Sequence, residues 1–119
     1  MKKVNTLGKV YLLGDRDRLN TYKIGSTRGN IEDRISSLQT GNAGEIYEIC
    51  HFDTDNPFIM ENFLHRKYNN KQILNEWFLL DSDDVKGFMD TCAKVEEQIE
   101  SLKENFFFRK KFEKNKKKT

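Results

Sequence analysis

The sequence predicts an α+β fold, in which a small central antiparallel three-stranded sheet is flanked by helices and followed by a long C-terminal helix. Short apolar segments separated by turn-rich sequence are typical of strands. Apolar residues at spacings of three and four positions indicate amphipathic helices. The 119 residues include 36% hydrophobic and 12% aromatic residues, which is enough for one modest core. We therefore expect a single folded domain.

The first two strands are expected to form a hairpin. Residues 8–13 and 21–26 are short apolar runs, and the polar segment between them is rich in residues that favour turns. Side chains alternate between the two faces of a strand, so this pairing allows Tyr11 and Lys23 to share a face. Residues 45–52 alternate well enough to predict the third strand.

Two helices are predicted beside the sheet. Asn30 is a typical N-cap for a helix that ends at Thr40, before a glycine. Pro57 is preorganised for the first turn of a second helix that runs to about Asn69, with the preceding Asp or Asn as its cap. We expect both helices to place one apolar stripe against the sheet.

A long C-terminal helix is predicted to begin at Ser82. Its apolar residues recur like the seam of a coiled coil, at Val85, Phe88, Cys92, Val95, Ile99, Leu102 and Phe106. The seam either packs against its own sheet or pairs with a second copy, giving a homodimer through residues 85–106. We divide the chain into a domain over residues 1–82, this helix over 83–108 and a basic tail over 109–119.

The formal net charge of +2 conceals an asymmetry. The tail over residues 109–119 carries a charge of +6, which leaves −4 for residues 1–108. Aromatic residues interleave with the basic ones, so Arg109, Lys110 and Lys111 are candidates for nucleic-acid binding through phosphates. A solvated tail and a membrane-surface anchor remain alternatives.

Several classes of protein are disfavoured. The positive charges at the N-terminus are not followed by an apolar run, so they do not form a signal peptide, and no segment is apolar and long enough to span a membrane. Cys50 and Cys92 lie far apart without further thiols at metal-ligand spacing, which argues against a zinc site or a disulfide framework. We expect an intracellular protein, in the cytoplasm or nucleus of a host cell and not secreted.

Four polar side chains occur in an informative order: Tyr11 in the first strand, Lys23 in its hairpin partner, Arg34 in the first helix and Glu61 in the second. Over about residues 8–80, this order resembles the GIY-YIG nuclease superfamily and in particular its compact phage-T5 branch. The motifs that carry the resemblance are Tyr22-Lys23-Ile24-Gly25-Ser26-Thr27, Leu38-Gln39-Thr40-Gly41-Asn42, Glu61-Asn62-Phe63-Leu64-His65 and Glu76-Trp77-Phe78.

The resemblance implies a metal-dependent endonuclease that hydrolyses phosphodiester bonds of DNA, with RNA as the less favoured substrate. Water would be activated near Tyr11, and the scissile phosphate would be bound by Arg34 and Lys23. Glu61 would hold one Mg²⁺ or Mn²⁺ ion. A lone carboxylate suffices for such an ion, because Mg²⁺ keeps several water ligands and takes phosphate oxygens as others. The planar fork of an arginine suits a phosphate in the same way.

Further candidates and alternatives follow from the same motifs. His65, one helical turn from the metal-binding carboxylate, is a catalytic candidate, whereas Tyr22 and Arg28 are candidates for nucleic-acid contacts. Lys23 stands where the superfamily has a second tyrosine. A catalytically weak or inactive DNA-binding module of the same fold is therefore one alternative, and a coiled-coil assembly protein is another. We expect Glu76-Trp77-Phe78 to have a structural role.

Overall fold

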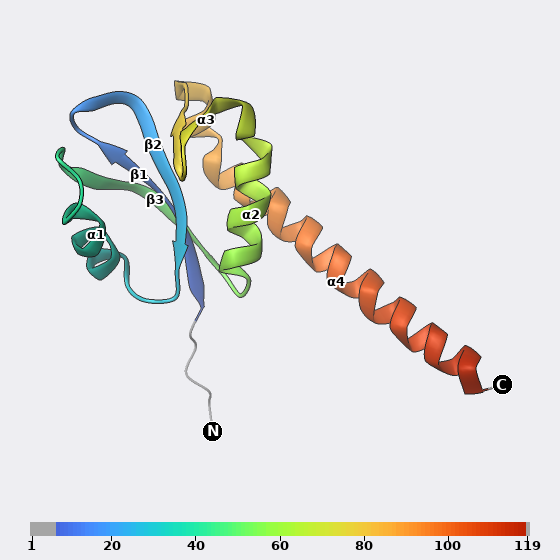
Figure 1. Ribbon diagram of the computed structural model, residues 1–119. Coiled ribbons are helices and arrows are strands. Elements are labelled where there is room, and N and C mark those ends of the chain that lie inside the picture. Colours follow the sequence, from blue (N-terminus) through green and yellow to red (C-terminus); the bar gives the residue numbers. More distant parts are fainter. Residues whose placement is uncertain (1–6, 119) are drawn as a thin grey trace.

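The computed structural model describes the backbone of residues 7–118 and the side chains of residues 7–105. Its centre is a five-stranded antiparallel sheet with strand order β3-β1-β2-β5-β4 (Figure 1). The strands are β1 (Gly8–Asp15), β2 (Arg18–Thr27), β3 (Ile46–Thr54), β4 (Gln72–Leu74) and β5 (Trp77–Leu79). The helices are α1 (Ile31–Gln39), α2 (Pro57–Lys67), α3 (Ser82–Lys86) and α4 (Phe88–Lys118), with a 3-10 turn η1 (Asn69–Lys71) after α2.

The prediction of a three-stranded sheet was wrong, because β4 and β5 add a second hairpin to the free edge of β2. Each of these strands has three residues, which is too short to display an alternating pattern. The turn between them contains Asn75, whose φ of 55° lies in the left-handed region that asparagine tolerates better than most residues. This turn brings Glu76 next to β2, where its carbonyl oxygen accepts a hydrogen bond from the Ile24 amide at 3.0 Å.

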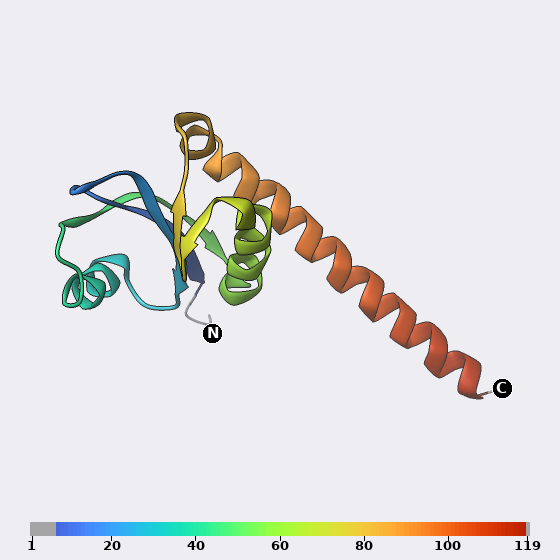
Figure 2. The same ribbon diagram turned by 45° about the horizontal axis from the view of Figure 1, so that its top comes forward.

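Helices cover both faces of the sheet (Figures 1 and 2). The larger core cluster lies between the sheet and helices α2 and α4, and its buried members include Val10, Leu12, Ile24, Met60, Leu64, Phe78, Phe88 and Cys92. The smaller cluster lies under α1 and comprises Tyr11, Leu13, Ile31 and Ile46, with Ile35 and Leu38 packed against it. Consecutive residues of β1 thus enter opposite clusters, as the two-residue period of a strand requires.

The C-terminal helix differs from its prediction in two respects. A break at Gly87 separates the short helix α3, which Asp81 and Asp84 stabilise through a capping box, from α4. Four seam residues are at most 5% exposed within the chain, namely Phe88, Cys92, Val95 and Ile99. Leu102, by contrast, is 56% exposed. These four seam residues therefore pack in the core of the single chain. The homodimer through residues 85–106 stays a prediction.

The side chain of Phe106 lies outside the described part of the chain, as do those of Arg109, Lys110 and Lys111. The backbone of α4 continues through these positions and projects from the body of the molecule (Figure 1). The division of the chain at residues 82 and 108 likewise stays a prediction. Within residues 7–118, the structure contains no helix of the length and apolarity that a membrane span needs.

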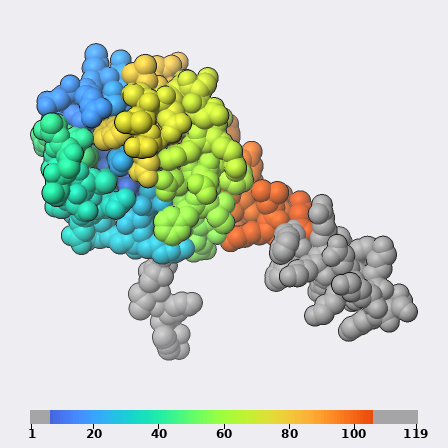
Figure 3. All heavy atoms as spheres, viewed as in Figure 1, coloured from blue at the N-terminus to red at the C-terminus, as the bar shows by residue number. Residues whose placement is uncertain are grey.

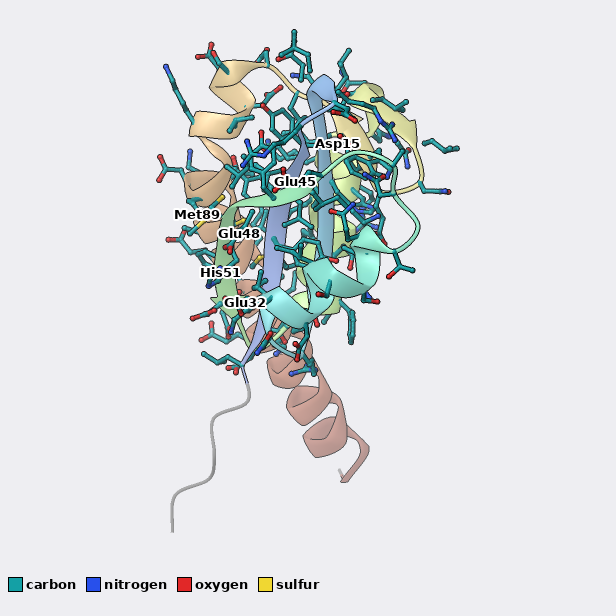
Figure 4. All side chains as sticks on the ribbon, turned by 90° about the vertical axis from the view of Figure 1, so that its left-hand side faces the viewer. Asp15, Glu32, Glu45, Glu48, His51 and Met89 are labelled. Carbon is teal, nitrogen blue, oxygen red and sulfur yellow. The ribbon has the colours of Figure 1, made fainter. Side chains whose placement is uncertain are left out.

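The β1–β2 turn is tighter than predicted, because Asp15 organises it from a buried position at the hairpin end of the sheet (Figure 4). Its carboxylate accepts hydrogen bonds from the Asp17 amide at 2.8 Å and from Asn42 Nδ2 at 3.0 Å. Arg18 Nε lies 3.5 Å from the same group. These contacts fix the hairpin against the loop that enters β3.

We predict that Asp15→Asn destabilises the fold by about 1–3 kcal/mol at neutral pH, because the new amide would face the Asn42 amide donor. The Asn42 hydrogen bond is the main cause that holds the pKa of Asp15 below its usual range. A carboxylate with a depressed pKa stabilises the folded state above its unfolded pKa, and this contribution disappears as the pH falls through the folded pKa. The difference between the wild type and Asp15→Asn should therefore shrink below about pH 4.

Urea unfolding at pH 7 and pH 3, followed by Trp77 fluorescence, measures this difference. Asp17→Asn is the matched control, since Asp17 is exposed in the same turn and contributes its backbone amide to Asp15. A difference that stays constant between the two pH values would contradict the assignment.

Candidate functional site

The candidate site lies where the edge of β2 loses its strand partner. Residues Thr21 to Lys23 pair with β5 on this edge. Beyond Lys23, β2 keeps β1 on its other edge, but the described part of the chain provides no strand on this one. Side chains from four elements and the β4–β5 turn converge here. In the space-filling view, the region is a recess between the turquoise atoms of α1 and the yellow atoms of the β4–β5 hairpin (Figure 3).

Tyr11 is the buried centre of this site. Its hydroxyl oxygen accepts a hydrogen bond from Arg34 Nε at 3.0 Å, which joins β1 to α1. The tyrosine lies opposite Gly25 in the β1–β2 register, and a Cβ atom on Gly25 would stand only 2.6 Å from the Tyr11 hydroxyl oxygen. Because Gly25 has no side chain, the Tyr11 ring can lie over it, and the ring hydroxyl then reaches Arg34.

The same burial determines the protonation of Tyr11. Burial raises the pKa of the Tyr11 hydroxyl above its usual value, and the hydrogen bond and charge of Arg34 offset this effect in part. An ordinary tyrosine already titrates near pH 10. In the free protein, Tyr11 is therefore a neutral phenol at physiological pH.

Glu61 projects from α2 toward the end of β2. One of its carboxylate oxygens accepts a hydrogen bond from Ser26 Oγ at 2.5 Å. The second lies 3.6 Å from His65 Nε2. Burial raises the pKa of Glu61 above its usual value, and the Ser26 hydroxyl counteracts this shift. The carboxylate is thus partly desolvated and held in a defined position.

His65 supports this arrangement from the next turn of α2. Its Nε2 atom lies 2.8 Å from the carbonyl oxygen of Ile24, and a carbonyl oxygen only accepts, so Nε2 carries the proton. The ring also packs edge-on against Phe78, at 5.0 Å between centroids. His65 therefore ties α2 to β2 beside Glu61.

Glu76 is the site residue that the sequence interpretation missed. Its carboxylate pairs with Lys23 Nζ at 3.2 Å, and the Lys23 side chain is only 12% exposed. Glu76 also contributes to the raised pKa of Glu61, so the two carboxylates lie near each other. The sequence does contain a turn-forming residue, Asn75, directly before Glu76. This pattern identifies Glu76 as a site residue only when β5 is known to pair with β2.

The remaining predicted residues lie apart from this group. Tyr22 packs against the larger core cluster, on the face of β2 opposite to Lys23. Arg28 follows the end of β2, where Nη2 donates to the Asp55 carbonyl oxygen at 3.3 Å and the guanidinium carbon lies 6.0 Å from the centroid of the Phe58 ring. The structure therefore brings five predicted residues together, namely Tyr11, Lys23, Arg34, Glu61 and His65.

The oxygen ligands of the site suit a hard cation. Residues 7–105 contain no group of three or more His, Cys, Asp or Glu side chains that are placed to hold a metal ion. The neighbouring carboxylates of Glu61 and Glu76 nevertheless fit Mg²⁺, which needs one or two carboxylates in addition to water and phosphate oxygens. They do not fit a structural zinc site, which requires four protein ligands.

A comparison with protein families matches the T5orf172 domain over residues 8–93, which is more than half of the chain. The chain belongs to the T5orf172 domain family. This family is related to GIY-YIG-like nucleases and is nuclease-associated in general. No curated protein and no solved structure gives a significant match. All the residues that meet at the recess lie within the matched residues 8–93. The family itself suggests a nuclease-like, DNA-related function in general terms.

We predict that Gly25→Ala destabilises the domain by about 1–3 kcal/mol and displaces the Tyr11 ring, because the added methyl group overlaps the ring. Gly41→Ala is the matched control, since nothing lies within 4 Å of a Cβ atom at that position. Urea unfolding and the NMR chemical shifts of the Tyr11 ring measure the two effects. Equal stability of both variants would show that the Tyr11 ring does not lie against Gly25.

Proposed function

We propose that this T5orf172 domain is a metal-dependent endonuclease of the GIY-YIG type that hydrolyses phosphodiester bonds of DNA. The observation that supports the proposal is the convergence of Arg34, Lys23 and two carboxylates around a buried tyrosine in one recess. Phosphodiester hydrolysis requires charge stabilisation on the phosphate oxygens and an activated water molecule. Cationic donors and oxygen ligands for a divalent ion provide for both.

Arg34 would bind the scissile phosphate. Tyr11 holds its Nε atom, so the plane of the guanidinium is fixed before substrate arrives. The two terminal nitrogens then remain as paired donors, an arrangement that matches two phosphate oxygens. Because the Tyr11 hydroxyl oxygen accepts from Arg34 Nε and burial raises the pKa of this hydroxyl in the free protein, we assign Tyr11 the orientation of Arg34 beside the attacking water rather than proton abstraction from that water.

Glu61 would hold one Mg²⁺ or Mn²⁺ ion, with Glu76 as a second carboxylate. When bound, such an ion supplies positive charge to the phosphate and lowers the pKa of a coordinated water molecule. Ser26 and His65 keep the Glu61 carboxylate in place. Lys23 Nζ lies 3.2 Å from the Glu76 carboxylate and neutralises its charge. When the Glu76 carboxylate turns toward the ion, Lys23 would contact the phosphate instead.

Cleavage of plasmid and single-stranded DNA in the presence of Mg²⁺ or Mn²⁺ tests the proposal. We expect Glu61→Gln and Arg34→Ala to lower the cleavage rate at least about 100-fold, and Tyr11→Phe to lower it at least about tenfold through loss of the Arg34 contact. Glu97→Gln is the control, because Glu97 is exposed on α4. Cleavage that is absent from the wild type, or equal in every variant, would refute the enzymatic function.

The Lys23–Glu76 pair favours one alternative, a DNA-binding module of the same fold with little or no activity. An ion pair at 3.2 Å neutralises one of the two cations of the site. The module predicts that the wild type binds DNA without cleaving it and that Arg34→Ala loses this binding. The two hypotheses therefore predict different results in the cleavage assay and the same result in the binding assay.

Metal binding provides an independent prediction that does not depend on catalysis. We expect Glu61→Gln to abolish Mn²⁺ binding and Glu76→Gln to weaken it about tenfold, because Mn²⁺ would retain the Glu61 carboxylate and replace the second carboxylate by water. Titration of Mn²⁺ followed by electron paramagnetic resonance measures both affinities in the absence of DNA. Equal affinity in Glu76→Gln and the wild type would remove Glu76 from the metal site.

A further inference from the structure

We propose that Phe58, with Arg28 beside it, forms a stacking platform for an unpaired base of the nucleic acid next to the candidate site. The domain would accordingly prefer single-stranded or locally unpaired substrate over intact duplex. This inference rests on the proposed function, because it names the substrate class of the same site.

The first observation is the exposure of Phe58. This residue lies in the first turn of α2, yet its side chain is 58% exposed, whereas Met60 and Leu64 of the same helix are fully buried in the core. The packing of α2 therefore does not explain the phenylalanine ring. A large aromatic ring that faces solvent offers a flat apolar surface of the kind on which bases stack.

The second observation is the position of the ring relative to Glu61. The two residues are three positions apart on α2, so their side chains are neighbours on one face of the helix. Glu61 in turn contacts Ser26 at 2.5 Å, and Ser26 precedes Arg28 by two residues at the end of β2. Phe58 is thus a helix neighbour of the candidate metal ligand, and Arg28 lies two residues beyond the serine that contacts this ligand.

The third observation is the cation at the ring. The guanidinium of Arg28 lies 6.0 Å from the centroid of the Phe58 ring, within the range of a cation–π contact. The Asp55 carbonyl oxygen, at 3.3 Å from Nη2, fixes the same side chain. A base on the ring would therefore place its own phosphate near a positioned positive charge.

These features together indicate that the ligand on the Phe58 ring is an unpaired base. Every base has a π-face, so stacking on an aromatic ring tolerates sequence and requires only that the base has left the duplex stack. A base inside an intact duplex already stacks on its neighbours and does not reach a ring on the protein surface. The platform consequently discriminates between nucleic-acid structures rather than between sequences.

The test compares two probes on the full-length chain, a fluorescein-labelled single strand of about 12 nucleotides and the matching duplex. Fluorescence anisotropy in EDTA measures binding without cleavage. We expect Phe58→Ala and Phe58→Leu to weaken single-strand binding about tenfold and duplex binding less than about twofold, whereas Phe58→Trp retains single-strand binding. Leucine preserves apolar contact without a π-face, so it separates stacking from hydrophobic contact.

Ile59→Ala is the matched control, since Ile59 is the neighbouring exposed apolar residue on α2, with 44% of its surface accessible. We expect this variant to bind both probes like the wild type. Wild-type binding by Phe58→Leu, equal losses on the two probes, or the same loss in Ile59→Ala would each overturn the platform. Urea unfolding of each variant shows that the fold is retained.

The outcomes also distinguish this inference from the proposed function. Metal-dependent cleavage by the wild type, together with single-strand binding that is insensitive to Phe58, would overturn the platform alone. Absent cleavage, together with binding that depends on Phe58, would overturn the enzymatic function and support the platform on a binding module.

Discussion

The contact between the Tyr11 ring and the backbone of Gly25 is the constraint on which the candidate site depends. The Tyr11 ring occupies the space in which a side chain on β2 would otherwise lie. In this position, its hydroxyl reaches Arg34 Nε. One ring therefore joins β1, β2 and α1 within a few ångströms. Because the ring is buried, its geometry is set by the core and not by the substrate, so the arginine is oriented before any ligand binds.

The electrostatic balance of the recess follows from this rigid frame. Two carboxylates, Glu61 and Glu76, face two cations, Lys23 and Arg34, in a partly desolvated region. Placing a carboxylate in such surroundings costs free energy unless a counter-charge or a donor is present. Lys23 compensates one carboxylate, whereas Glu61 has a neutral hydroxyl donor and keeps a raised pKa. In the function that we propose, the ion bound by Glu61 would supply the missing positive charge.

The sequence predicted the parts of this site that local patterns determine. Alternation along a strand placed Tyr11 and Lys23 on one face, and the β1–β2 register confirms that geometry. Glu76 was not predicted as a site residue, because the β4–β5 hairpin forms only against the edge of β2 and has no periodic pattern of its own. Asn56 shows the same limit. It precedes Pro57 as a cap would, yet its side chain makes no capping hydrogen bond and instead accepts from Lys103 Nζ at 2.6 Å.

This last contact shows how α4 supports a site that it does not touch. Lys103 holds Asn56, and Glu96 accepts a hydrogen bond from Thr54 Oγ1 at 2.7 Å, so α4 fixes the connection from which α2 begins. Met60 lies in the core cluster shared with Phe88 of α4. Because this face of α2 is held in place, Glu61 at the next position of the helix is presented to Ser26 of β2 in a fixed orientation. The T5orf172 match extends to residue 93 and so includes Phe88 and Cys92 of α4, whereas Val95 and Ile99, which belong to the same core cluster, lie beyond it.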